Sequence, residues 1–495
     1  MNDMTESPLP ASLYTAASVR QMDRYAIETL GIPGPVLMER AGQACFGSLR
    51  TAWPQARTLS VLTGAGNNGG DGFVIARLAH QAGWDVRVYP AAPPAALKGD
   101  AATALQEYRE AGGALVDFIP EQFDGAEILV DALLGTGTTR PVEGFYADLI
   151  QATRRFRGKI VAVDIPSGLD ADTGAVLNVA VKADMTVTLL GLKRGLFTGQ
   201  GLEHCGRVVF SDLAVPPAVQ QSVARSACLL PKLTRGLPPR PRHAHKGDFG
   251  HVLVVGGAEG YSGAARLAAE AAARVGAGLV SVATHPSNAP LLNLGCPELM
   301  CHGIRNTESL APLLRNATVV VLGPGLRLSD WAYSLWEQVL KTELPVILDA
   351  DGLNFLSGHS AHRHNWILTP HPGEAARLLG MSNADIQRNR YAALQELQAT
   401  YGGVVVLKGS GSLILGESGV PSVCTAGNPG MASGGMGDVL SGVIAGLVAQ
   451  DQELFDAAEW GVRLHAAAGD TAAETGERGL MARDLLTPLR QWVNA

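Results

Sequence analysis

The 495-residue sequence has few cysteines, few aromatic residues, no strong charge of either sign and no long hydrophobic run. Its six cysteines contain no CxxC pair, which argues against a disulfide framework or a structural zinc site. The net charge of −7 argues against a protein that binds nucleic-acid backbones, because such a protein needs a basic face. The most apolar window, near Val439–Ala449, is too short to span a bilayer. The start MNDMTESPLP lacks a signal peptide's basic n-region, so we expect a soluble, cytoplasmic protein.

Glycine and proline, by contrast, are abundant, with 59 and 28 residues. They follow no collagen-like period, so they predict many functional turns in an ordinary globular protein. At about 150 residues per domain, the length predicts two to four domains.

From about residue 15 to residue 213, short apolar runs alternate with glycine turns and helical periodicity. This alternation predicts an α/β fold with a parallel, doubly wound sheet. The expected strands are Leu59–Thr63, Asp85–Tyr89, Ile128–Ala132, Ile160–Asp164, Met185–Leu190 and Arg207–Ser211, and the expected helices are Gly72–Ala82 and Ala101–Ala111.

Residues Val215–His245 break this pattern with Pro216-Pro217 and the run GLPPRPRH, which predicts a partly extended linker. The alternative is a basic docking peptide. A second α/β stretch follows and shares no repeat with the first, so we expect two different folds. Its expected strands are His251–Gly256, Leu279–Thr284, Thr318–Leu322, Pro345–Asp349, Trp366–Thr369 and Val404–Lys408, and its helices are Gly263–Val275 and one from near Gly437 to Val448.

The first glycine-rich loop reads TGAGNNGGDG over Thr63–Gly72, between an expected strand and an expected helix. Its GxGxxG pattern lets backbone amides approach a phosphate at a helix N-terminus. The next strand ends Val88-Tyr89-Pro90, without the acid that a dinucleotide-binding unit uses for the ribose. We therefore expect phosphate or nucleotide binding, but not in the dehydrogenase manner; the alternative is a purely structural turn.

Two further loops begin with Asp131 and Asp164, each at the end of an expected parallel strand. Carboxylates at such ends point into the crevice where ligands bind, so Asp164 is a candidate general acid or base. Asn68, Asp131 and Ser167 offer oxygen ligands, which suit a hard cation. For each aspartate alone, capping of its own loop is the alternative.

The strings GAGNNGGDG, DALLGTGTTRP and VDIPSGLDADTG resemble the NAD(P)H-hydrate epimerase family over most of residues 15–213. The resemblance implies that Asp164 acts at the reacting carbon, C6 of the hydrated nicotinamide, and that Asn68, Asp131 and Ser167 hold potassium. Whether C6 inverts through hydroxide loss or ring opening stays open. The implied substrate contacts are Asn67, Asn68, Gly69, Gly70, Asp71, Gly135, Thr136, Gly137, Thr138, Thr139, Arg140, Pro141, Asp164 and, from spacing, Tyr146.

In the second stretch, NPGMASGGMGD precedes the long apolar helix. Glycines and the helix N-terminus predict an anion hole, in which Asp438 accepts a proton from a substrate hydroxyl; helix capping is the alternative. Lys408–Ser412 (KGSGS) follows a strand and is not a P-loop, but its amides and lysine suit nucleotide phosphates. His371 is held between two prolines, and Asp349 and Asp351 either position magnesium or cap a turn.

The strings HKGDFG, GGAEGYSGAA, GPGL, DADGLN, TPHPGE, KGSGS and NPGMASGGMGD resemble the ADP-dependent NAD(P)H-hydrate dehydratases of the ribokinase-like superfamily over residues 243–492. The resemblance implies a ribokinase-like α/β sandwich that phosphorylates the C6 hydroxyl at the expense of ADP and then eliminates phosphate. It implies that Ala265, Gly325, His371 and Asp438 face the hydrated nucleotide, and that Lys408, Gly409, Ser410, Gly411, Ser412 and Gly437 face ADP.

We therefore expect a bifunctional repair enzyme for hydrated NADH and NADPH (NADHX and NADPHX), with K⁺ in a Rossmann-like epimerase domain (1–214), a linker (215–242), and Mg²⁺ and ADP in a dehydratase domain (243–495). The family of the second half also implies a homo-oligomer. One rival is a small-molecule kinase for vitamin precursors or sugars, with a non-catalytic first half. The other makes the first half a nucleotide-sensing or protein-binding module.

Overall fold

The computed structural model describes residues 9–119, 125–359 and 361–495. The chain forms two compact units, Met1–Leu229 and Leu230–Ala495. Among the described residues, no helix is long and apolar enough to cross a membrane.

The first unit is built on a six-stranded parallel sheet of order β3-β2-β4-β5-β6-β8. Pairing is in register, with Val61 of β2 between Val88 of β3 and Val130 of β4. This confirms the expected parallel α/β sheet. The strands are β2 (Thr58–Thr63), β3 (Asp85–Pro90), β4 (Ile128–Ala132), β5 (Lys159–Val163), β6 (Met185–Leu189) and β8 (Arg207–Ser211).

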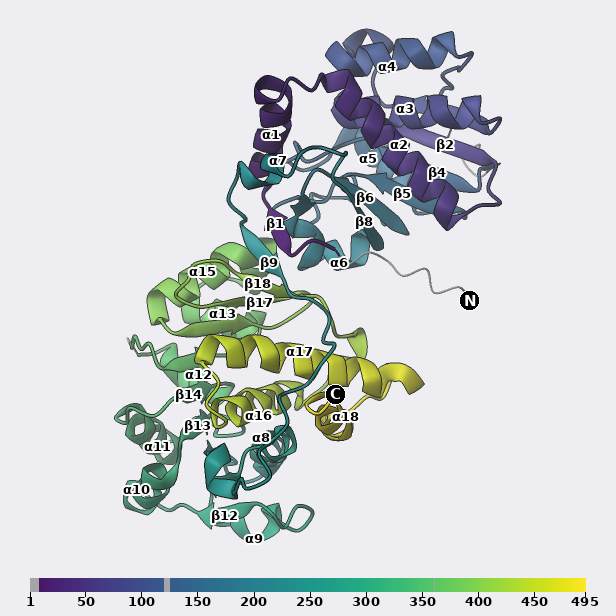
Figure 1. The fold of residues 1–495 in the computed structure, drawn as a ribbon. Coiled ribbons are helices and arrows are strands. Elements are labelled where there is room, and N and C mark those ends of the chain that lie inside the picture. The colour runs from purple at the N-terminus through teal and green to yellow at the C-terminus, as the bar shows by residue number, and fades with distance from the viewer. Residues whose placement is uncertain (1–8, 120–124, 360) are drawn as a thin grey trace. The chain divides into compact units, whose positions relative to one another are not determined.

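Two hydrophobic clusters cover the two faces of this sheet, because successive strand side chains point to opposite sides. Leu59 and Val61 face the cluster under α2 (Gly34–Ala52), α3 (Asn67–Gln81) and α4 (Gly99–Glu110), which lie side by side in Figure 1. Leu62 and Leu129 face the cluster under α5 (Gly144–Thr153). The unit's other elements are β1 (Ser12–Tyr14), α1 (Ala16–Arg24), the π-helix Tyr25–Thr29, the 3₁₀ turn Pro94–Ala96, β7 (Leu192–Lys193), the 3₁₀ turn Arg194–Phe197, α6 (Gly201–His204), α7 (Ala218–Gln221) and β9 (Ala227–Leu229).

Helix α3 begins at Asn67 and not at Gly72, where the residue pattern places its start. Glycine is a poor helix former, so propensity alone puts this glycine run outside the helix. Close packing decides otherwise: a Cβ at Gly69 would overlap the Gly64 carbonyl oxygen, and one at Gly72 would lie 2.7 Å from the Ala132 side chain. The glycines therefore let the helix lie directly on the strand ends.

The described residues of the second unit form nine strands in the order β12-β11-β10-β13-β14-β15-β16-β17-β18. Pairing is parallel from β12 to β16 and antiparallel from β16 to β18. The strands are β10 (His251–Val255), β11 (Leu279–Thr284), β12 (Met300–Gly303), β13 (Val319–Leu322), β14 (Val346–Leu348), β15 (Trp366–Leu368), β16 (Val404–Leu407), β17 (Ser412–Leu415) and β18 (Ser422–Cys424).

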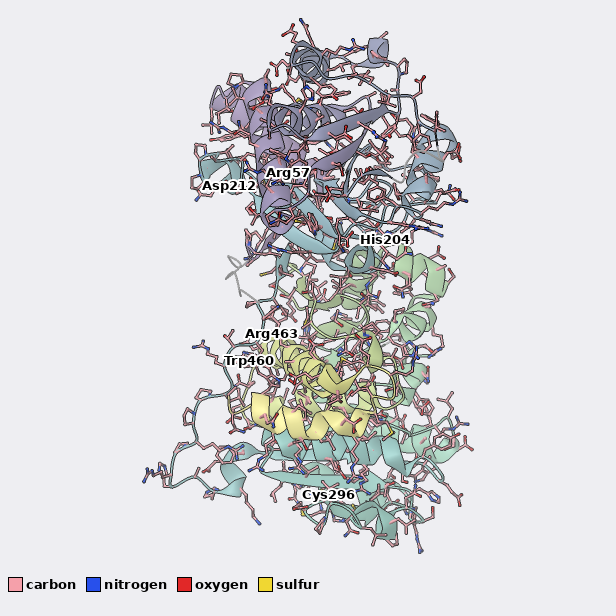
Figure 2. The ribbon with its side chains drawn as sticks, turned by 90° about the vertical axis from the view of Figure 1, so that its right-hand side faces the viewer. Arg57, His204, Asp212, Cys296, Trp460 and Arg463 are labelled. Carbon is pink, nitrogen blue, oxygen red and sulfur yellow. The ribbon has the colours of Figure 1, made fainter. Side chains whose placement is uncertain are left out.

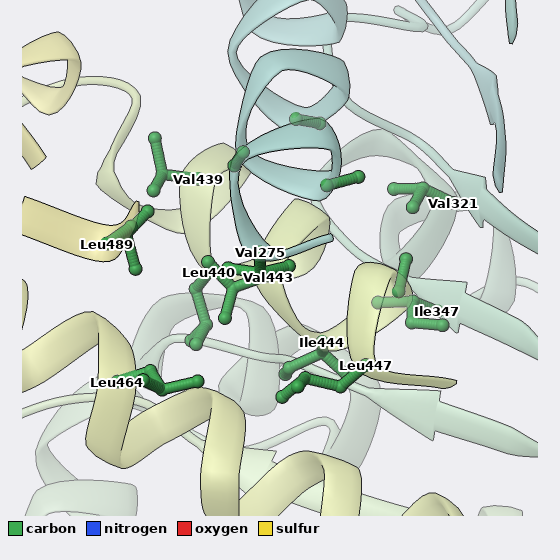
Figure 3. Packing of buried hydrophobic residues seen from close by; sticks show 14 of the residues in the cluster. Val275, Val321, Ile347, Val439, Leu440, Val443, Ile444, Leu447, Leu464 and Leu489 are labelled. Atoms are coloured by element: carbon green, nitrogen blue, oxygen red, sulfur yellow. The ribbon is translucent and has the colours of Figure 1, made fainter. Parts of the chain in front are cut away.

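Helix α16 (Met436–Val448) lies at the centre of this unit's core, and most of its residues are buried. Figure 3 shows its apolar side chains among those of the strands and of the neighbouring helices α8 (Ser262–Val275), α17 (Leu454–Ala472) and α18 (Leu486–Trp492). Gly442 lets the α16 backbone approach α8, since a Cβ there would overlap the Ala268 carbonyl oxygen. The unit's other helices are α9 (Ala289–Leu292), α10 (Thr307–Asn316), α11 (Asp330–Leu340), α12 (Asp351–Leu356), α13 (Pro372–Leu379), α14 (Asn383–Arg388) and α15 (Arg390–Tyr401), with 3₁₀ turns at Lys246–Phe249, Pro429–Met431, Ala473–Thr475 and Ala482–Leu485.

The segment expected to be a linker contains structure that composition alone does not reveal. Its first part holds α7 and β9, and β9 pairs antiparallel with β1 in the first unit. From Leu230 the chain is irregular but anchored within the second unit, where Leu237 N–H donates to the Val493 carbonyl (2.9 Å). Arg463, near Trp460 in Figure 2, donates to the Pro231 carbonyl (3.1 Å). The two units thus divide after Leu229, fifteen residues beyond the expected end of the first domain.

Candidate functional site

The three motifs of the first unit meet at one edge of its sheet. Strands β2, β4 and β5 are neighbours, and the segments starting at Gly64, Leu133 and Asp164 leave their carboxyl ends. In parallel sheets, ligands bind at this edge. The expected clustering of the GAGNNGGDG, DALLGTGTTRP and DIPSG segments is therefore a feature of the structure.

Asp131 forms a buried polar network with Ser167. The Ser167 hydroxyl donates to Asp131 Oδ1 (2.6 Å), and the Ser167 amide donates to Oδ2 (2.7 Å). The Leu134 segment joins them: its amide donates to Ser167 Oγ (2.8 Å), and its carbonyl accepts from Asn68 Nδ2 (3.2 Å). Asn68, Asp131 and Ser167 therefore surround one turn of chain. Burial raises the pKa of Asp131 to about 6, against the opposing effect of the Ser167 hydrogen bonds.

Asp164 stands at the end of β5 in a strained backbone conformation, with φ of +65°. Such conformations gather at functional sites, where surrounding contacts hold them. Its Oδ1 accepts a hydrogen bond from the Leu189 amide (3.0 Å) and forms an ion pair with Lys193. The Lys193 side chain is completely buried and also donates to the Leu189 carbonyl (2.8 Å) and Thr188 Oγ1 (3.2 Å).

Two charged groups near Asp164, Lys193 and Asp71, have shifted pKa values. Burial lowers the pKa of Lys193, while Asp164 and Asp71 oppose that fall. Burial and the Asp164 and Asp23 charges raise the pKa of Asp71 well above its usual value. Lys193 and Asp23 are members of this site that sequence reasoning missed. The signal for Lys193 was a lysine inside the apolar run LLGLKRGLF.

The other sequence-predicted contacts of this site divide by exposure. Gly69 and Gly70 are buried, Gly135, Thr136 and Thr138 are half-buried, and Asn67, Gly137, Thr139, Arg140 and Pro141 are exposed. Arg20 of α1 donates to the Thr136 carbonyl (3.3 Å), which ties the loop to that helix. Tyr146 is half-buried against the hydrophobic cluster under α5. Part of its ring therefore serves packing.

The second unit has a charged cluster at the carboxyl ends of β14, β15 and β16, which are adjacent. Lys408 Nζ lies 2.8 Å from Asp349 Oδ1 and 3.7 Å from Glu374 Oε2. The Ser441 hydroxyl donates to Asp349 Oδ2 (2.6 Å). Burial disfavours charge on Lys408, but Asp349 and Glu374 outweigh it and raise the pKa of Lys408.

Asp438 lies in the first turn of α16, beside this cluster. Burial raises the pKa of Asp438 to about 7, and the charges of Asp349 and Glu374 add to the effect. A Cβ on the neighbouring Gly437 would lie 3.1 Å from Lys408 Nζ, so the glycine keeps the lysine close to the helix N-terminus. The sequence-predicted base and the cationic loop residue therefore share one site.

His371 and Glu374 form a capping box at the start of α13. His371 Nδ1 accepts from the Gly373 amide (3.0 Å), and Glu374 Oε2 accepts from the His371 amide (2.7 Å). Burial and the nearby Lys408 lower the pKa of His371. Burial raises the pKa of Glu374 to about 7. Glu374 was missed as a site residue, although it ends the motif TPHPGE.

The remaining predicted residues of this unit have defined local roles. Asp351 Oδ2 accepts from the Arg327 amide (2.7 Å), and Asp349 is occupied by Lys408 and Ser441. Gly325 has φ of +61°, which favours glycine. Ala265 is completely buried on α8, so its methyl group does not reach an open surface. The turn between β16 and β17 consists of Lys408–Gly411, and Ser412 is the first residue of β17.

The fold and the two sites define the class of protein. It is an α/β protein of two units, and each unit has acidic side chains and a glycine-rich helix start at the carboxyl edge of a parallel sheet. Family models match both units, "NAD(P)H-hydrate dehydratase" over residues 252–490 and "YjeF-related protein N-terminus" over 34–195. A bifunctional NAD(P)H-hydrate repair enzyme of Coxiella burnetii is 49% identical over 487 residues, covering 97% of this chain and 99% of that protein. The chain belongs to the family of bifunctional NAD(P)H-hydrate repair enzymes, as its motifs predict.

Another relative matches nearly the whole chain, and a solved structure matches about half of it. The bifunctional NAD(P)H-hydrate repair enzyme of Escherichia coli K12 is 42% identical, and the match covers 98% of this chain and 95% of that protein. A crystal structure of an ADP/ATP-dependent NAD(P)H-hydrate dehydratase from Bacillus subtilis is 29% identical with a TM-score of 0.47, covering 52% of this chain and 93% of that chain.

Proposed function

We propose that the first unit interconverts the C6 epimers of NADHX and NADPHX and that the second unit dehydrates the (S) epimer to NADH or NADPH, using ADP. Near-complete coverage of the Coxiella burnetii enzyme supports this assignment to two units. A homo-oligomeric state and a cytoplasmic location remain predictions of the sequence analysis.

In the first unit, Asp164 exchanges a proton with the C6 hydroxyl: it gives one as hydroxide leaves, or takes one as the C6–N1 bond breaks and the ring opens. The ion pair with Lys193 and the hydrogen bond from the Leu189 amide hold its carboxylate in place. The Asn67–Asp71 segment at the start of α3 would bind the nucleotide's phosphates, since a helix N-terminus offers amides and a positive dipole end.

A potassium ion fits the donor set of this unit. Asn68, Asp131 and Ser167 carry the amide, carboxylate and hydroxyl oxygens that suit a hard cation, and their hydrogen bonds link them to one another or to the Leu134 segment, so an ion would replace some of these bonds. The buried Asp131 carboxyl has a raised pKa, and a neighbouring cation favours its ionised form. When bound, the ion would supply positive charge beside the DALLGTG and DIPSG loops.

In the second unit, Asp438 accepts the proton of the C6 hydroxyl group. The hydroxyl oxygen then attacks the β-phosphorus of ADP. The bond from that phosphorus to the bridging oxygen breaks, and AMP leaves. Phosphate then departs from C6 with the bonding electrons, assisted by the ring nitrogen, and loss of a proton from C5 restores the dihydropyridine. The Gly434–Gly437 backbone and Lys408 stabilise the transferring phosphoryl group.

Magnesium belongs to this proposal as a partner of ADP. Among the described residues, no three His, Cys, Asp or Glu side chains are grouped to hold a metal ion. Asp349 and Asp351 already accept protein donors. Magnesium commonly keeps waters and substrate phosphates as most of its ligands, so it would enter with the diphosphate and neutralise its charge.

The observation that carries the proposal is Asp438 in the first turn of α16, with Lys408 beside it. The test is recovery of nicotinamide absorbance from mixed epimers of NADHX with ADP, Mg²⁺ and K⁺. We expect full recovery with the unmodified enzyme, only the (S) share with Asp164→Ala, and none with Asp438→Ala. A stable phosphorylated small alcohol, with NADHX untouched, would establish the kinase rival. Persistent epimerisation in Asp164→Ala would contradict the role of Asp164.

A further inference from the structure

Arg390 is a buried cation directly behind the KGSGS loop. It is the first residue of α15, and its side chain is 1% exposed. Asn389 caps this helix by accepting from the Ala392 amide (3.0 Å), which fixes the position of Arg390. Burial lowers the pKa of its guanidinium to about 10, so the group stays charged at neutral pH.

The Arg390 guanidinium contacts several backbone carbonyl oxygens at the loop. Its Nη2 atom lies 3.2 Å from the carbonyl oxygen of Leu407, the last residue of β16, and 3.3 and 3.4 Å from those of the loop residues Lys408 and Gly411. The Ser412 hydroxyl donates to the carbonyl of Gly409 (3.0 Å). Because the guanidinium is buried, the three carbonyls that it contacts point into the protein.

Gly409 shows that the loop is shaped around this side chain. Its φ is +136°, and a Cβ there would lie 2.9 Å from Arg390 Nη1. A larger residue would therefore push the loop away from the guanidinium. A carbonyl oxygen facing a phosphate repels it, whereas a cation behind the loop attracts it.

We propose that Arg390 is a positioning residue for nucleotide binding: it turns the carbonyls of the KGSGS loop inward, so that the loop can receive the phosphates of ADP. The inference rests on the proposed function, which assigns ADP to this loop. Lysine in its place would keep the charge but lose the planar fork that spans several carbonyls.

The test compares Arg390→Lys with Arg388→Lys, a matched change at an exposed arginine two residues away, paired with Asp385. We expect Arg390→Lys to raise the KM for ADP about tenfold or more, as loss of charged hydrogen bonds implies, with the KM for (S)-NADHX within twofold. Arg388→Lys should leave both unchanged. A purely structural role would reduce active enzyme and kcat without moving the KM for ADP.

A second variant covers the case in which Arg390→Lys does not fold. Gly409→Ala changes only the loop, and we expect the same selective rise in the KM for ADP. An unchanged KM for ADP in the folded variants, beside normal ADP-dependent turnover of the unmodified enzyme, would overturn the role of Arg390. Failure of the unmodified enzyme to bind ADP by calorimetry would instead overturn the proposed function.

Discussion

Lys193 shows how a single residue can hold a carboxylate that we propose to be catalytic. It is completely buried and spans Asp164, Thr188 and the Leu189 backbone. Removing Lys193 would take the ion-pair partner from the Asp164 carboxylate and loosen its orientation.

We expect Lys193→Met to slow epimerisation at least about tenfold, because the Asp164 carboxylate would lose its ion-pair partner and its fixed orientation. Dehydration of pure (S)-NADHX should keep its rate. The matched control is Lys182→Met, whose partner Glu203 forms an exposed ion pair that contributes little. Normal epimerisation by Lys193→Met would show that Asp164 acts without it.

The pKa of Asp438 predicts a pH dependence for dehydration. A base with a pKa of about 7 is ionised above that pH, so kcat/KM for (S)-NADHX should rise as pH increases through about 7. Glu374→Gln removes a like charge, which should move this rise to lower pH. Rate profiles between about pH 5.5 and 8.5 measure it. The matched control is Glu337→Gln, at an exposed pair with Lys341; an unmoved profile in Glu374→Gln would contradict the coupling.

At the scale of elements, the contact between α8 and α16 positions the N-terminus of α16, where Asp438 lies. Gly442 has no room for a side chain, because a Cβ would overlap the Ala268 carbonyl oxygen. We expect Gly442→Ala to lower the free energy of unfolding by about 1–3 kcal/mol through overpacking. The matched change Gly263→Ala on α8 meets nothing within 4 Å and should be neutral or stabilise by up to about 1 kcal/mol. Denaturant unfolding followed by circular dichroism would measure both, and equal stabilities would show that α16 can shift.

At the scale of the whole molecule, two units with separate hydrophobic cores predict two unfolding transitions. A ligand that binds only folded protein stabilises its unit by about 2.7 kcal/mol at 100 times its Kd. Calorimetry should therefore show K⁺ raising one transition and Mg²⁺ with ADP raising the other. Sodium at equal ionic strength and the variant Ser167→Ala are the controls for potassium. A single transition raised by both ligands would contradict separate sites.

Much of the fold was predictable because its signals are local. The apolar runs Ile128–Ala132, Arg207–Ser211 and Leu279–Thr284 are strands with the expected bounds. Asp131, Asp164 and the glycine loops lie at the carboxyl ends of parallel strands, as the sequence pattern predicts, and this position favours ligand binding. The glycines also led to a wrong prediction for the start of α3. That start depends on close packing against β4, which the helix propensities of the residues do not reflect.

Tertiary structure decided which side chains meet those motifs. Lys193 reaches Asp164 across 29 residues of sequence, Glu374 reaches Lys408 across 34, and Arg390 contacts a loop that begins 18 residues later. In the sequence each is an ordinary charged residue, because burial and partners arise only when distant elements pack. The same reason explains β9, whose three residues become a strand by pairing with β1. The sequence by itself thus determines the chemical groups of the motifs, whereas the tertiary structure determines their pKa values, because burial and charged partners arise from packing.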